Sequence, residues 1–214
     1  MIALIDYKAG NLTSVRKALS FIGSDFVVPE STAGCAGAQG LIVPGVGHFS
    51  ATEALDETWR RTILDAVDAG TPLLGICVGM QWLFEGSDEA PGVPGLGLMA
   101  GRIARLAGDA DARLKVPHVG WNALEIRGQG RLLQGLPSGA QVYFTHSYAA
   151  PVTETCAAAT THANVFSSAV ERDNVFGVQF HPEKSSDAGL QILRNFLAIV
   201  AGSEHPARRK NGTS

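Results

Sequence analysis

The sequence predicts an α/β protein with a central, mostly parallel sheet flanked by helices, and with antiparallel strands added in the second half. In the first half, short apolar runs alternate with amphipathic helical patterns, which is typical of a parallel sheet with helices on its faces. The second half consists mainly of short strand-like runs, and no linker or internal repeat is apparent. We therefore expect one domain over residues 1–202, followed by a disordered tail over residues 203–214.

In the first half, strands are expected where apolar runs end at turn residues, and helices where apolar residues recur with helical spacing. The expected strands are residues 1–6, 25–28, 40–45 and 71–76. Helices are expected over residues 11–23, 51–70 and 78–86. Asn11 is a candidate N-cap of the first helix, and Gly23 and Gly70 are candidate stops of the first two.

In the second half, strand-like runs occupy residues 95–106, 116–126, 141–150, 155–161 and 165–183. The last of these runs contains Arg172-Asp173-Asn174, which predicts a hairpin turn. A final helix is expected from Ser185 or Ser186 to Gly202. These runs indicate antiparallel or mixed pairing joined onto the parallel sheet.

Composition excludes several classes of function. The chain has 214 residues, 45% of them hydrophobic, and a formal charge of −3, which argues against a general nucleic-acid binder. Its three cysteines are widely spaced and match neither a disulfide framework nor a zinc site. The N-terminal residues lack a secretory signal, and no apolar run approaches the roughly 18 residues needed to span a bilayer. We expect a cytoplasmic protein that contacts neither nucleic acid nor membrane.

Gly75, Cys77 and Gly79 have the spacing of a nucleophile elbow, in which the nucleophile lies on a sharp turn from a strand into a helix. The glycines permit the turn, and we expect Cys77 to be exposed above the carboxyl end of the sheet. The adjacent helix N-terminus favours the reactive thiolate. An inert core cysteine is the alternative, because cysteine is among the most buried residue types.

His181 and Glu183 supply a base for the thiol and a carboxylate that orients the base. They flank Pro182, and in an extended chain residues two apart point to the same side. A surface histidine beside a surface glutamate is the alternative. Because the preceding strand leads to the sheet edge where Cys77 is expected, the conjunction favours a Cys-His-Glu site.

Acyl transfer also needs hydrogen-bond donors for a developing oxyanion. The backbone N–H of Val78 is one candidate, because Val78 follows the nucleophile. The segment Gly45-Val46-Gly47 is the candidate for the second donor, since its glycines permit unusual backbone conformations. An ordinary glycine-rich turn remains the alternative there.

The motifs PGVGHF (residues 44–49), GICVGMQ (75–81) and VQFHPEKS (178–185) together resemble the class I glutamine amidotransferases, whose triad is Cys, His and Glu. The segments IDYKAGNL (5–12), FEGSDEAPGVPGLGL (84–98), VPHVGWN (116–122) and YFTHSY (143–148) make the chain most similar to the glutaminase subunits of imidazole glycerol phosphate synthase. Three departures from that pattern are Lys8, Val78 and Val119, where the family usually has Gly, Leu and Met. None of them falls on the triad.

The resemblance implies that Cys77 attacks the side-chain amide of glutamine, that His181 passes a proton to departing ammonia, and that Glu183 orients His181. A glutamyl thioester is then hydrolysed to glutamate. The residues that match substrate-contacting positions are Gly45, Gln81, Glu89, Ser147 and Tyr148. For Gln81 a surface helix position, and for Glu89 a solvated acidic loop, remain the alternatives. The resemblance implies no metal and no cofactor.

The resemblance also implies a partner, a (β/α)8-barrel cyclase subunit that forms a heterodimer with this chain. Ammonia passes to that subunit, which makes imidazole glycerol phosphate and AICAR in histidine biosynthesis. The residues that match the partner-facing surface are Asn11, Val119, Trp121, Asn122, Tyr143 and Lys184. An amidotransferase subunit of another pathway, such as anthranilate synthase, and a catalytically silent binding module are the competing interpretations.

Overall fold

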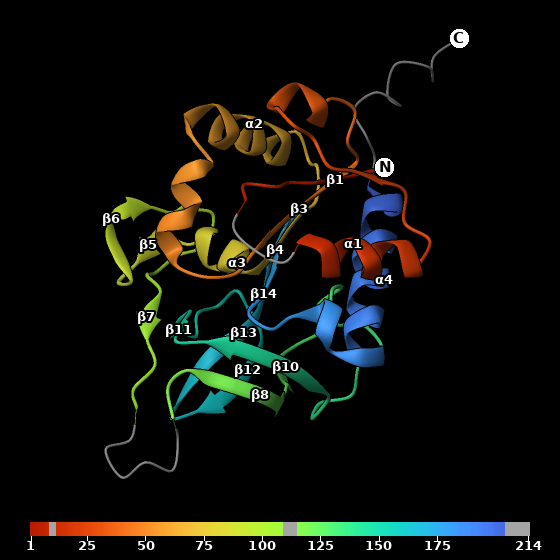
Figure 1. The fold of residues 1–214 in the computed structure, drawn as a ribbon. Coiled ribbons are helices and arrows are strands. Elements are labelled where there is room, and N and C mark those ends of the chain that lie inside the picture. The colour runs from red at the N-terminus through yellow and green to blue at the C-terminus, as the bar shows by residue number, and fades with distance from the viewer. Residues whose placement is uncertain (9–11, 109–114, 204–214) are drawn as a thin grey trace.

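An eight-stranded sheet forms the centre of the protein, with strand order β2-β1-β3-β4-β14-β13-β12-β9 (Figure 1). The computed structural model describes residues 1–8, 12–108 and 115–203. Strands β2 (Phe26–Val27), β1 (Ile2–Leu4), β3 (Gly40–Gly45), β4 (Leu73–Cys77) and β14 (Val175–Val178) pair in parallel. Strands β13 (Asn164–Arg172), β12 (Cys156–His162) and β9 (Glu125–Ile126) continue the sheet in antiparallel pairing. The predicted fold class is confirmed.

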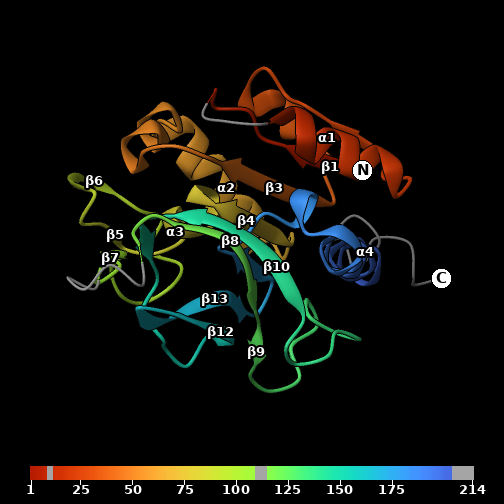
Figure 2. The same cartoon turned by 60° about the horizontal axis from the view of Figure 1, so that its bottom comes forward.

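Helices cover both faces of the parallel part of the sheet, as Figures 1 and 2 show. Helices α1 (Leu12–Phe21) and α4 (Ser186–Gly202) bury Val15, Leu19, Ile192 and Phe196 on one face. Helices α2 (Glu57–Asp68) and α3 (Val78–Trp82) bury Ile63, Val67, Met80 and Trp82 on the other. Because both faces are covered, β3 and β4 are buried at every position, which explains why they read as continuous apolar runs.

Strand β14 joins the two halves of the sheet. It pairs in parallel with β4 and antiparallel with β13. The predicted turn lies between β13 and β14, where Asp173 has a φ of 52°, a left-handed conformation that Asp tolerates better than most residues. This junction brings the segment after β14 to the end of β4.

A second layer of strands lies over β12 and β13 (Figure 2). It is formed by β8 (His118–Ala123) and β10 (Gln141–His146), which pair antiparallel with Trp121 opposite Tyr143. Phe144 of β10 packs on Phe166 of β13 with ring centroids 5.8 Å apart. The short strands β5 (Gly86–Ser87), β6 (Ala90–Pro94), β7 (Ala104–Arg105) and β11 (Tyr148–Ala149) complete the strands of the described residues.

Several predicted elements differ in the structure. The helix expected over residues 78–86 ends at Trp82, and Gly86 begins β5. The strands expected over residues 116–126 and 141–150 are each divided into two. The helix expected over residues 51–70 is divided into a 3₁₀ helix, η2 (Phe49–Ala54), and α2, because the Asp56 side chain accepts a hydrogen bond from Trp59 N and starts a new helix. Residues 95–106 form a strand only at Ala104–Arg105. Their apolar side chains fill the core from a loop instead. The one-turn 3₁₀ helices η1 (Thr32–Cys35) and η3 (Pro182–Lys184) were not expected.

The last helix ends at the predicted residue. Helix α4 ends at Gly202, and residues 204–214, most of the expected tail, lie outside the described residues. Asn11, the candidate N-cap, also lies outside them.

Helix α3 approaches β3 so closely that Gly79 has no room for a side chain. A Cβ at this position would collide with the Val43 carbonyl oxygen. We expect Gly79→Ala to lower the free energy of unfolding by about 2–3 kcal/mol, as overpacking of a filled core does. Urea denaturation measures this loss.

Gly92→Ala is the matched control, because a Cβ there meets nothing within 4 Å. It should change the free energy of unfolding by less than about 0.5 kcal/mol. Equal stability of the two variants would show that α3 has room to move away from β3.

Candidate active site

Cys77 occupies a strained turn between β4 and α3. It is the last residue of β4, and its φ of 54° and ψ of −111° lie outside the regions that non-glycine residues favour. Such a conformation costs about 1–3 kcal/mol and persists only where the surrounding structure enforces it. Here α3 and β3 enforce it through the close contact at Gly79.

Cys77 is reached through a cavity rather than being exposed on the surface. The residue is only 3% exposed, which corrects the expectation of an exposed nucleophile. It lines a cavity of about 230 Å³, here called the larger cavity because the second cavity at this site has only about 10 Å³. The other lining residues are Gly47, Val78, Gln81, Glu89, Pro117, Thr145, His146, Ser147 and Tyr148.

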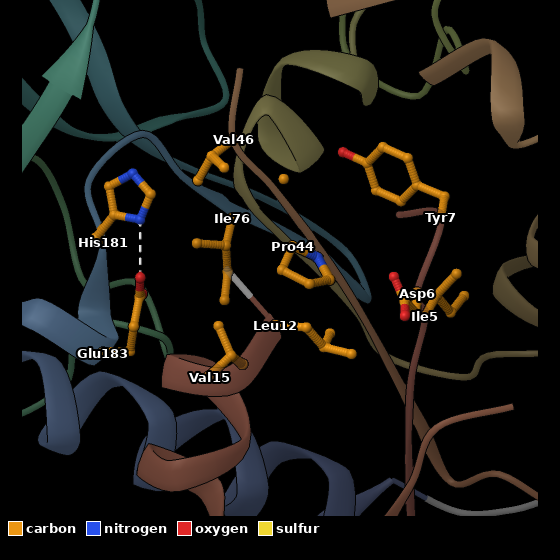
Figure 3. A pocket seen from close by; sticks show the side chains of 11 residues that line it. Ile5, Asp6, Tyr7, Leu12, Val15, Pro44, Val46, Ile76, His181 and Glu183 are labelled. Carbon is orange, nitrogen blue, oxygen red and sulfur yellow. Dashed lines mark hydrogen bonds and ion pairs between the residues drawn. The ribbon is translucent and has the colours of Figure 1, made fainter. Parts of the chain in front are cut away.

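His181 and Glu183 form a buried pair. The His181 Nδ1 atom lies 2.9 Å from Glu183 Oε1, and both side chains are 2% exposed (Figure 3). The expectation of an extended chain through Glu183 was wrong. His181 is extended, with φ −100° and ψ 97°, but Glu183 lies in the 3₁₀ helix η3. The turn at Pro182 brings the carboxylate back to the imidazole.

The surroundings of His181 favour its charged form. Burial alone would lower its pKa, but Cys77 and Glu183 outweigh burial and raise the pKa to about 10. Nevertheless, the His181 Nε2 atom has no hydrogen-bond partner within the described residues. The imidazole lies close enough to Cys77 for the two groups to interact, but Nε2 is not aligned for a hydrogen bond to the sulfur. In enzymes such bonds often align fully only when substrate binds.

Strand β10 holds His181 in place through its backbone. The His181 N–H donates to the Tyr143 carbonyl oxygen at 2.9 Å. Ser185 adds a second connection, since its hydroxyl donates to the His181 carbonyl at 2.6 Å and accepts from the Tyr143 N–H at 2.9 Å. The position of the imidazole thus depends on β10.

The candidate oxyanion residues are divided between two cavities. Gly47 and Val78 line the larger cavity beside Cys77. Val78 begins α3, so its N–H has no acceptor within that helix. Gly45 and Val46 instead line a smaller cavity of about 10 Å³ (Figure 3). Gly45, expected to contact substrate, is therefore not brought to the larger cavity.

The smaller cavity lies on the side of His181 and Glu183 that faces β1. Tyr7 bounds it opposite the pair, with Pro44, Val46 and Ile76 between them (Figure 3). A Cβ on Gly45 would collide with the Tyr7 hydroxyl. Glycine at this position is therefore explained by the aromatic side chain packed beneath it.

The other four expected substrate residues all line the larger cavity. Ser147 and Tyr148 are at its wall, and Glu89 is at the turn between β5 and β6. The Glu89 carboxylate accepts a hydrogen bond from Phe49 N at 2.8 Å, so Glu89 is not simply a solvated loop residue. Gln81 is 3% exposed and donates from Nε2 to the Tyr148 carbonyl and to Gln179. It is thus not a helix-surface residue.

Sequence reasoning missed three buried polar residues at this site, His118, His146 and Gln179. His146 Nε2 lies 3.0 Å from His118 Nδ1, and Gln179 Nε2 lies 3.7 Å from Cys77 Sγ. The signal was present in the sequence. Each residue occupies an inward position of a strand or strand end, where polar side chains are uncommon.

Side chains of β8, β10 and η3 form a patch on the surface. We call it the aromatic patch, and it consists of Val119, Trp121, Tyr143 and Lys184. Val119 and Trp121 are 57% and 51% exposed. The Trp121 and Tyr143 rings are 6.1 Å apart, and Lys184 Nζ lies 5.8 Å from the Tyr143 ring centroid. Asn122 does not share this face, because its amide is bonded to His118 and to the Thr161 carbonyl.

In the part of the chain that the structure describes, no group of three or more metal-ligating side chains is placed to hold an ion. No helix within these residues has the length and apolar character needed to cross a membrane.

A strained cysteine at a strand-to-helix turn, beside a buried His-Glu pair and above a mostly parallel sheet, defines a class of enzymes that use a thiol nucleophile. The sequence model of the family "Glutamine amidotransferase class-I" matches residues 3–200, and the chain belongs to this family. A solved structure described as a glutamine amidotransferase has the same fold, with a TM-score of 0.71 at 21% identity, covering 94% of this chain and 98% of the other.

Among curated relatives, the chain is similar to the imidazole glycerol phosphate synthase subunit HisH of Deinococcus radiodurans, with 49% identity over 94% of each chain. It is 46% identical to HisH of Thermococcus kodakarensis, over 93% of this chain and 100% of the other. A structure of PurLQS from Thermotoga maritima shares the fold, with a TM-score of 0.67 at 16% identity over 92% of this chain and 97% of the other.

The buried histidines predict acid sensitivity. Burial first, and then neighbouring histidines, lower the pKa of His118 to about 3, and burial lowers that of His146 to about 4, against 6.5 for an ordinary histidine. Below about pH 6.5 the unfolded chain binds protons that the folded protein does not, so stability falls as the pH decreases toward the folded values. Urea denaturation at about pH 7 and about pH 5 should show this loss.

His118→Phe keeps a ring that can stack on Phe144 but removes one titrating group, so the loss of stability between the two pH values should be smaller. His48→Asn, at an exposed histidine, should leave the loss unchanged. An undiminished loss in His118→Phe would contradict the assignment of this histidine as an acid-sensitive group.

Proposed function

We propose that this chain is the glutaminase subunit of an imidazole glycerol phosphate synthase and hydrolyses glutamine to glutamate and ammonia. The observation that carries the proposal is that His181, bonded to Glu183, also interacts with Cys77 at the end of β4, while Cys77 lines a cavity of about 230 Å³. The family and the similarity to HisH subunits support the choice of glutamine as substrate.

In the first half-reaction, His181 takes the proton from Cys77, and the sulfur attacks the side-chain amide carbon of glutamine. The developing oxyanion receives hydrogen bonds from the Val78 N–H and from an N–H of the Val46-Gly47 segment. The imidazolium then protonates the leaving nitrogen, and ammonia departs as a thioester forms. Glu183, bonded to Nδ1 at 2.9 Å, holds the ring and stabilises its charge.

In the second half-reaction, water attacks the thioester, with His181 as the base. The C–S bond breaks, glutamate leaves, and the thiol is restored. The two steps together consume one glutamine and one water and release one glutamate and one ammonia. No cofactor or metal takes part in either step.

The polar groups of the larger cavity suit the amino-acid end of glutamine. The Glu89 carboxylate complements an ammonium group, while backbone groups of Ser147 and Tyr148 are placed at the wall for the carboxylate. Because Gln81 Nε2 is already bonded to two acceptors, we propose that Gln81 contacts substrate only through its remaining Oε1 atom.

We further propose that the aromatic patch docks a (β/α)8-barrel cyclase subunit, to which ammonia is passed for the synthesis of imidazole glycerol phosphate and AICAR in the cytoplasm. The subunit names of the relatives support a partner. A patch of exposed aromatic and apolar side chains is typical of an interface core. It borders the site directly, because Tyr143 bonds His181 through its backbone.

The nucleophile is tested by Cys77→Ala in complex with the cyclase subunit. Removing the sulfur eliminates thioester formation but leaves the cyclase intact. We expect glutamine-dependent synthesis to fall by at least about 10³-fold, while synthesis from added ammonium salts is kept. Continued use of glutamine by this variant would exclude Cys77 as nucleophile. Cys156→Ala, at a buried cysteine outside the cavity, is the control and should retain both activities.

Dependence on the partner is tested by measuring glutamate release with and without the cyclase subunit and its ligand. Because Nε2 of His181 is not aligned in the free chain, we expect the free chain to be weakly active. Docking of the partner should increase kcat by at least about tenfold. Full activity of the isolated chain, unchanged by the partner, would refute the proposed coupling.

A further inference from the structure

Gln179 is fully buried at the end of β14, facing the nucleophile. The parallel register pairs Val178 with Ile76, so the next residue of each strand, Gln179 and Cys77, lie side by side. The Gln179 side-chain nitrogen is 3.7 Å from Cys77 Sγ. Its backbone is fixed by a bond from Gln179 N to the Ser168 carbonyl at 2.9 Å.

The orientation of the Gln179 amide follows from its neighbours. The Tyr148 carbonyl oxygen can only accept, so the Gln81 atom 2.9 Å away must be the NH₂ group. That same NH₂ group lies 3.1 Å from the Gln179 amide and must donate to its oxygen. Gln179 therefore turns its oxygen toward Gln81 and its NH₂ group toward the sulfur.

A second series of hydrogen bonds, through His118 and His146, fixes the Tyr148 carbonyl. His146 Nδ1, 2.9 Å away, must donate to it. Since the low pKa values of His118 and His146 keep both rings neutral, His146 Nε2 accepts from His118 Nδ1 at 3.0 Å. His118 Nε2 then accepts from the Asn122 amide at 3.3 Å. All these donors point one way, from β8 toward Tyr148.

We propose that Gln179 is a positioning residue for the nucleophile, and that its amide, oriented by Gln81 and the Tyr148 carbonyl, donates a hydrogen bond that holds Cys77 Sγ and stabilises its thiolate. This role rests on the proposed function, because it concerns the sulfur of the same nucleophile, Cys77. An uncharged donor suits this place. It stabilises the anion without forming a salt bridge that would compete with His181.

A carboxylate in place of the Gln179 amide would repel the thiolate, and an apolar side chain would remove this donor from it. The test is the rate of Cys77 alkylation by iodoacetamide across a pH series, followed by mass spectrometry of the Cys77 peptide in the full chain. Gln179→Leu should slow alkylation at neutral pH by about tenfold, because hydrogen bonds to charged groups are the stronger ones. The midpoint of the pH profile should move upward.

Gln179→Glu has nearly the same shape and should move the midpoint further in the same direction. Asn195→Leu is the matched control. Asn195 lies on α4, away from Cys77, and its partly buried amide donates to the Leu132 and Gln134 carbonyls in the segment between β9 and β10. The Asn195→Leu protein should lose about as much stability as Gln179→Leu, but its alkylation profile should not change. Glutamine turnover by Gln179→Leu should show a lower kcat with KM nearly unchanged.

A folded Gln179→Glu or Gln179→Leu protein with the wild-type alkylation profile would overturn the proposal. If Gln179→Leu does not fold, the isosteric Gln179→Glu variant decides alone. Tyr7 and His181, the ionisable neighbours that interact with Cys77, are unchanged in every variant. Alkylation requires neither glutamine nor the cyclase, so a negative result here leaves the proposed function intact and is distinguishable from its failure.

Discussion

The parallel register between β4 and β14 is the constraint on which the rest of the site depends. It pairs Val178 with Ile76, and each strand then leaves the sheet in its own way. Strand β4 turns sharply at Cys77 into α3. After β14 the chain continues through Gln179 to His181. Residues about a hundred positions apart are thereby brought together at one sheet edge. A shift by one residue would turn Gln179 to the opposite face and separate the imidazole from the sulfur.

Around that edge, buried polar side chains form two hydrogen-bonded groups. His181 Nδ1 and Glu183 Oε1 bond each other, whereas His181 Nε2 and Glu183 Oε2 have no partner within the described residues. Gln81, Gln179 and the Tyr148 carbonyl form a second group. Buried polar groups are favourable only when their hydrogen bonds are made. The bonds of the second group therefore fix the Gln81 and Gln179 amides beside the sulfur of Cys77, which lines the larger cavity.

Much of the fold and the main site residues could be predicted from the sequence. The alternation of apolar runs with helical patterns predicted the parallel sheet, and Gly75, Cys77 and Gly79 predicted the turn. The division of residues 51–70 was missed because helical spacing alone does not reveal a cap such as Asp56. Residues 95–106 were misread because Leu96, Met99 and Ile103 are buried from a loop, which has no period. Gln179 and His146 were missed because their roles come from contacts between distant strands.

The backbone bonds from Tyr143 to His181 and Ser185 have a consequence for the evolution of this protein. Strand β10 exposes the aromatic side chain of Tyr143, and the backbone of the same residue is hydrogen-bonded to the backbone of His181. Sequence drift on the outer surface of β10 is therefore constrained by chemistry as well as by recognition. Side chains on the outer surface of β10 can vary only where the substitution leaves the backbone of this strand in place.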